Sequence, residues 1–161
     1  MDHPTNINEA DVWLDRIRRN GKEVIKNTII AGIVIFLISY GGLYSAIRIS
    51  PDFFIDYINP MFNSDGSRDL YFYMHPFVLS LSLSVFWNRF RKMFGGNKLK
   101  IGLEFGLVYA FVALVPVMWI TYSAMDVNLS MIGTWLFYGM TQACIAGVVF
   151  AYINPFKDSK N

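Results

Sequence analysis

Polar side chains that could carry chemistry are rare in the long apolar stretches of this chain of 161 residues. Glu104 is the one ionised side chain within the four stretches, and Gln142 and His75 are the strongest hydrogen-bonding groups beside it. A group of this kind is costly in apolar surroundings, so it is by default a functional hypothesis. The candidate polar sites are therefore Glu104, Gln142 and His75, which could line a path for a solute or a proton.

Two of these residues also have a purely structural interpretation. Glu104 follows Lys100 by one helical turn, about 5 Å along a helix, so the two can form an ion pair at the membrane boundary. On a helical wheel Glu104 lies roughly opposite Gly102 and Gly106, and a proton-coupling role requires that this side face other helices. His75, near the outer end of its stretch, can cap a helix or bond headgroups, or sense pH.

Motifs for catalysis are missing from the sequence. It contains no Ser/His/Asp set, no HExxH, no CxxC and no phosphate-binding loop. Cys144 is the only cysteine, which excludes an intrachain disulfide and the thiol oxidoreductases that need paired cysteines. One histidine near a span cannot supply a haem or zinc site in a monomer. We therefore expect no catalytic residue, no cofactor and no metal site, and predict that the protein is not an enzyme.

Four apolar stretches determine the fold class. Each is close to the roughly 20 residues that a helix needs to cross a bilayer. The composition agrees, because 54% of the residues are hydrophobic and only 16% are charged. The sequence predicts an all-α membrane protein with four transmembrane helices arranged as two antiparallel hairpins, in a single domain of residues 28–153. The predicted spans are residues 28–47, 70–87, 101–123 and 129–153.

The connections between these stretches differ in charge. Twelve of the fourteen basic residues lie before the first stretch, between the second and third, or after the fourth. The remaining two, Arg48 and Arg68, lie on the other side, which also carries five aspartates. Because basic loops stay in the cytoplasm, both termini are predicted to be cytoplasmic, and an even number of spans satisfies this.

The segments outside the spans also have features of their own. Residues 1–27 are predicted to form a cytoplasmic amphipathic segment with a short surface helix that begins at Asn8, resting on the membrane or docking a soluble partner. Residues 154–161 form a cytoplasmic tail. In the outer loop 48–69, a helix start at Ser50-Pro51-Asp52 predicts a two-turn helix on the outer leaflet that ends at Asn59-Pro60. Residues 63–69 lack the distal glutamate of a calcium loop, so we predict a turn.

Small residues recur every four positions in the third and fourth stretches. Such stripes let helix backbones approach closely, and the connection at 124–128 is short, so a tight hairpin is expected. Pro116 removes one backbone donor and is expected to kink its helix, leaving the carbonyl of Val112 open to another donor. Ser80 and Ser84 share a face of the second stretch. The predicted packing residues are Gly102, Gly106, Ala110, Gly139, Ala143 and Gly147.

The inner loop 88–100 holds five basic residues among aromatic and aliphatic ones. Each exposed Lys or Arg near an anionic leaflet contributes about 1 kcal/mol of attraction. Anionic lipid headgroups are therefore expected at Arg89, Arg91 and Lys92, although the same residues are also explained by the orientation rule alone. Nucleic-acid binding is not supported.

The sequence from Lys100 onward shows a weak resemblance to a known group. Its glycine-rich stretch with a proline, the segment Trp119–Tyr122, the short turn, Trp135, Gln142 and Ala146-Gly147 resemble the C-terminal hairpin of small uncharacterised bacterial four-helix inner-membrane proteins. The resemblance implies a multi-pass protein of a bacterial inner membrane. It brings no activity with it.

Together these observations favour a non-catalytic interaction or assembly component. Its partners would be the lipid bilayer and either a second copy or another membrane protein. The alternative is a small dimeric transporter or channel for a small solute or proton, in which Glu104, Gln142 or His75 lines the path.

Overall fold

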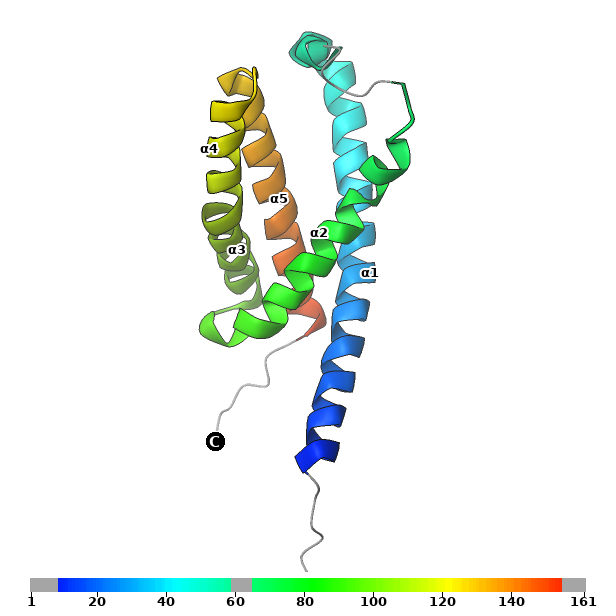
Figure 1. Cartoon of the computed structure of the whole chain (residues 1–161), viewed down its shortest axis with the longest axis vertical. Helices are drawn as coiled ribbons and strands as arrows, with labels where there is room; N and C mark the ends of the chain where they lie inside the picture. The colour runs from blue at the N-terminus through cyan, green and yellow to red at the C-terminus, as the bar shows by residue number, and fades with distance from the viewer. Residues whose placement is uncertain (1–8, 59–64, 155–161) are drawn as a thin grey trace, which may run out of the picture.

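The computed structural model describes residues 9–58 and 65–154, and in these residues it is helical without any strand. Four helical segments are long and apolar enough to cross a membrane: 18–49, 69–93, 98–124 and 129–153. This confirms the prediction of an all-helical chain with four candidate spans, as expected for a multi-pass membrane protein (Figure 1). The elements are α1 (Glu9–Ile49), η1 (Pro51–Ile58), α2 (Asp69–Phe90), η2 (Arg91–Met93), α3 (Lys98–Tyr109), η3 (Ala110–Leu114), α4 (Val115–Ala124) and α5 (Leu129–Ile153).

Helix α1 is continuous over 41 residues, which differs from the separate short helix expected within residues 1–27. The described part of that segment contains no proline and a single glycine, Gly21, whose cost of about 1 kcal/mol does not interrupt a long helix. At 1.5 Å per residue α1 is about 60 Å long, roughly twice the hydrocarbon thickness of a bilayer. Its first turns extend beyond the other helices (Figure 1). Asn8, the predicted start, lies outside the described residues.

The third span consists of α3 and α4 joined by the π-helical turn η3. In this turn the N–H of Val115 bonds the carbonyl of Ala110, five residues back rather than four. Pro116 follows directly and has neither an N–H to donate nor room for a carbonyl four residues back. The wider turn is a known way to accommodate such a residue. The disturbance that Pro116 causes is therefore located in the residues before it.

Helices α3 and α5 form the most extensive contact of the structure. A Cβ atom built on Gly102 would lie 2.5 Å from the backbone of Val148, and one on Gly106 would lie 2.5 Å from the backbone of Cys144. Backbone therefore meets backbone along this contact, which only glycine permits at that separation. Ala110 and Ala143 are buried as well. Gly139 meets a side chain instead, because its Cβ would lie 2.9 Å from Leu114.

Helices α1 and α2 pack through aromatic side chains rather than small residues. Phe77 of α2 covers Gly32 of α1, where a Cβ would come within 2.5 Å of the ring. Further out, Tyr40 donates its hydroxyl to the carbonyl of Phe72 at 2.9 Å, and its ring lies 5.0 Å from that of Tyr73. Pairs of aromatic rings at these distances stabilise the packing by more than the burial of their apolar area alone.

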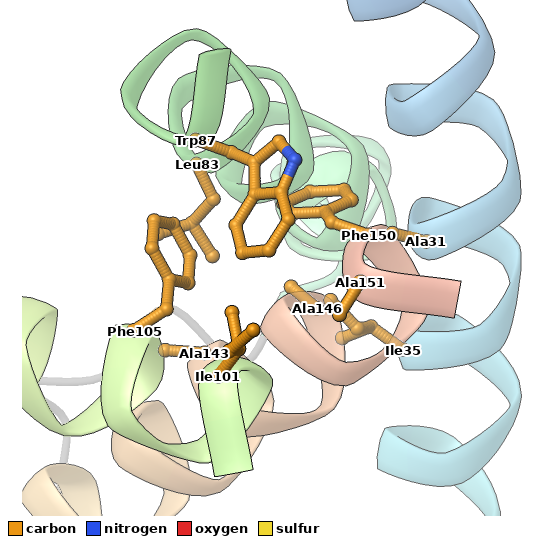
Figure 2. Close-up of a cluster of buried hydrophobic side chains, with 10 residues drawn as sticks. All are labelled: Ala31, Ile35, Leu83, Trp87, Ile101, Phe105, Ala143, Ala146, Phe150 and Ala151. Carbon is orange, nitrogen blue, oxygen red and sulfur yellow. The ribbon is translucent and has the colours of Figure 1, made fainter. Parts of the chain in front are cut away.

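One apolar cluster joins α1, α2, α3 and α5 (Figure 2). At its centre the ring of Trp87 lies 5.2 Å from that of Phe105 and 5.9 Å from that of Phe150. All three side chains are fully buried. The cluster is therefore the point at which the pair α1–α2 is fastened to the pair α3–α5. Its members are Ala31, Ile35, Leu83, Trp87, Ile101, Phe105, Ala143, Ala146, Phe150 and Ala151.

The loop 48–69 contains a helix where the sequence predicts one, with 3₁₀ rather than α geometry over Pro51–Ile58. The ring of Tyr57 lies 6.5 Å from that of Trp135, so η1 packs against the N-terminal part of α5. Asn59 and Pro60 lie outside the described residues, as do residues 63 and 64 of the predicted turn. In the described part of that turn, Gly66 has a φ of 77° and Asp65 accepts a hydrogen bond from the N–H of Ser67 at 2.9 Å.

Candidate functional site

Gln142 lies inside the bundle at the contact between α1 and α5. Its side chain is 2% exposed, and its Nε2 donates to the hydroxyl of Ser39 at 2.9 Å. The Oε1 atom has no hydrogen-bond partner within the described residues. A polar pair between two spans contributes only about 0.6 kcal/mol on average. Because its Oε1 atom is unpaired, Gln142 can still accept a hydrogen bond from another polar group.

Glu104 lies on the outside of the bundle. Gly102 and Gly106 face α5, whereas Glu104 is exposed on the opposite side of α3. It lines a shallow, open groove together with Lys100, Leu103 and other residues of the same helix. Among the described residues, no basic nitrogen lies within 4.0 Å of the Glu104 carboxylate, and this includes the nitrogen of its neighbour Lys100. The four helices therefore do not enclose this carboxylate.

His75 occupies a third, separate place near the N-terminal end of α2, where its side chain is exposed and the next residue, Pro76, is buried. The structure therefore does not bring the three predicted polar residues together. Gln142 lies between α1 and α5, Glu104 lies on the outward face of α3, and His75 lies on α2. A single path lined by all three is not present within one copy of the chain.

A second polar region lies where the C-terminal parts of α2 and α5 meet the middle of α1. Asn154, which follows α5, donates to the side-chain oxygen of Asn27 in α1 at 2.8 Å. Ser84 of α2 and Thr28 of α1 both donate to the carbonyl of Val24, at 3.4 and 2.8 Å. Asn27 and Ser84 are fully buried. The sequence indicated the shared face of Ser80 and Ser84 but not the residues that meet it.

An ion pair lies just beyond this region. Arg91, at the end of α2, pairs with Glu23 of α1, and both side chains are partly buried, at 30% and 17% exposure. The guanidinium of Arg91 is held by this carboxylate, and the lipid headgroup expected at Arg91 stays a prediction. Arg89 and Lys92 are exposed and remain available to the headgroups proposed for them. The pair fixes the C-terminal end of α2 against α1, although a partly exposed pair contributes at most about 1 kcal/mol.

Comparisons of the chain with protein-family models, with curated proteins and with solved structures gave no match. Within residues 9–58 and 65–154, no three His, Cys, Asp or Glu side chains lie close enough together to hold a metal ion. The resemblance of the C-terminal hairpin to small bacterial membrane proteins therefore stays a prediction, and the function has to be inferred from the residues themselves.

Proposed function

We propose that this chain is an integral protein of a bacterial inner membrane, with two antiparallel hairpins and both termini in the cytoplasm. Two contacts in each pair of helices support the hairpins. Gly102 lies against Val148 and Gly106 against Cys144, so residue numbers rise along α3 while they fall along α5. The contacts of Val24 with Ser84 and of Gly32 with Phe77 support the same antiparallel direction for α1 and α2. The distribution of basic residues supports the cytoplasmic termini.

Within that membrane the protein acts as a non-catalytic interaction or assembly component. The observation that carries this proposal is the outward position of Glu104 among exposed apolar side chains such as Leu103 and Leu107. An acidic group at the centre of a span costs up to about 3 kcal/mol in lipid, and less near the boundary. Lys100 lowers this cost only slightly, because an ion pair in which the lysine precedes the glutamate by four residues is the weaker of the two orders on a helix. A donor from another protein would remove this cost.

The proposal is tested by photo-crosslinking in the native membrane. Benzoylphenylalanine at position 107, one turn beyond Glu104, is expected to give one discrete protein adduct. The same group at position 33 of α1, which is exposed to a similar extent, is the matched control. Combining the first variant with Glu104→Gln is expected to lower the adduct yield at least about threefold, because the pairing charge is lost. The same adduct pattern at both positions, or lipid adducts alone, would contradict the proposal.

A small transporter or channel is the second candidate, and Gln142 is the observation that favours it. Its pair with Ser39 places polar groups deep within the bundle, between α1 and α5. Toward the inner end, however, the fully buried apolar side chains of Ile35, Ala146 and Phe150 follow. A path through one copy would therefore have to open this layer.

Gln142→Leu separates the two candidates. In an interaction component it removes one weak interhelical bond and one unpaired oxygen, so we expect complementation of a deletion strain within about twofold of wild type. The folded yield in mild detergent is measured alongside. Loss of complementation at an unchanged folded yield, shared by Glu104→Gln and accompanied by loss of solute uptake, would instead identify a transporter.

A further inference from the structure

The second polar region contains buried groups that no described residue satisfies. Asn27 and Ser80 are both fully buried. The Nδ2 of Asn27 and the hydroxyl of Ser80 have no hydrogen-bond partner within the described residues. A buried polar group left unpaired costs about 1–3 kcal/mol, and in native proteins such groups are usually paired with protein or with ordered water.

The packing of α1 against α2 places these two residues at the same level. Val24 contacts Ser84 on one side of them, and Gly32 contacts Phe77 on the other. Asn27 lies between Val24 and Gly32 along α1, and Ser80 lies between Phe77 and Ser84 along α2. Asn154 adds the end of α5 by donating to Asn27. Polar donors and acceptors from α1, α2 and the end of α5 therefore gather at one level of the bundle.

A stripe of polar side chains extends from Ser80 toward the C-terminal end of α2. Ser80, Ser84 and Asn88 follow one another at four-residue spacing and so share one stripe of α2. Asn88 is half-buried, and neither atom of its amide has a partner within the described residues. The partly exposed pair of Arg91 and Glu23 stands at the end of the stripe.

We propose that Asn27 and Ser80 share an internal water-binding site at the junction of α1, α2 and α5, which is reached from the C-terminal end of α2 along this stripe. The groups that face it are neutral and include both donors and acceptors, which is the chemistry that water satisfies. Water-mediated bonds are nearly as favourable as direct ones and exchange partners readily. The site therefore connects the two hairpins through water-mediated hydrogen bonds, which can change partners when the helices shift. This inference does not depend on the proposed function.

Water-edited solid-state NMR of the labelled full-length protein in lipid bilayers tests the site. The measured quantity is the rate at which water magnetisation reaches the side-chain amide of Asn27. We expect a rate within about threefold of that of the exposed Asn97 side chain, and at least about fivefold above that of the backbone amide of Ala146, which lies in the apolar core. A rate for Asn27 as slow as that for Ala146 would show a dry site and overturn the inference.

A pair of serine variants tests whether Asn27 and Ser80 share the water. Ser80→Ala removes one of the groups that hold it, so the transfer rate to Asn27 is expected to fall to about half or less. Ser82→Ala is the matched control, because Ser82 is exposed and donates to the carbonyl of Val78 in its own helix at 3.1 Å. This control is expected to leave the rate unchanged. An unchanged rate in Ser80→Ala, or an equal fall in both variants, would contradict a shared site.

Discussion

Gly147→Val is expected to lower the free energy of unfolding by about 3 kcal/mol or more, a large overpacking effect. A Cβ atom at this position would collide with the carbonyl oxygen of Gly102 and would lie 2.9 Å from the ring of Phe105. The first of these atoms belongs to the backbone and cannot rotate away, so α5 would have to separate from α3 along the whole contact. Thermal unfolding in mild detergent and the yield of monodisperse protein measure the effect.

Gly133→Val is the matched control for this prediction. Gly133 lies in the same helix, but a Cβ atom there would meet nothing within 4 Å. The variant is expected to keep its unfolding free energy within about 0.5 kcal/mol of wild type, as surface substitutions usually do. Similar losses in both variants would contradict the prediction, because valine has the higher helix propensity of the two residues and only Gly147 lies against another backbone.

The helical content and the number of candidate spans could be predicted from the sequence because both depend on local properties, namely length and hydropathy. Continuity of α1 was missed for a related reason. The amphipathic character of residues 9–27 suggested a separate surface helix, yet nothing in that part of the chain ends a helix, and the backbone continues unbroken to Ile49. The hydrophobic pattern thus indicated where apolar surface lies but not that one helix continues through both segments.

The polar contacts depend on properties that are not local. Gln142 and Ser39 are 103 residues apart in the chain, and Asn154 and Asn27 are 127 apart. No periodicity within one helix identifies such partners, because they are determined by which helices become neighbours and in which register. Gly32 illustrates the same limit, since it has no small residue four positions later and its role follows only from the ring of Phe77 above it.

Trp87→Ala is the second variant for which we expect a large effect, a loss of about 3 kcal/mol or more of unfolding free energy. Trp87 is fully buried and touches aromatic rings of both α3 and α5 (Figure 2). Between helices in lipid the hydrophobic effect contributes little, so the cost comes from lost van der Waals contact around a cavity that lipid chains cannot reach. Thermal unfolding monitored by circular dichroism in mild detergent measures it.

Trp119→Ala serves as the control for this prediction, because Trp119 is 80% exposed on α4 and its removal leaves no cavity. Its unfolding free energy is expected to change by less than about 1 kcal/mol. Trp87→Phe, which retains a ring against Phe105, is expected to fall between the two. If Trp87→Ala and Trp119→Ala were equally stable, the aromatic cluster would not be what fastens α1 and α2 to α3 and α5. Contacts outside the cluster, such as the hydrogen bond between Gln142 of α5 and Ser39 of α1, would then have to hold the pairs together.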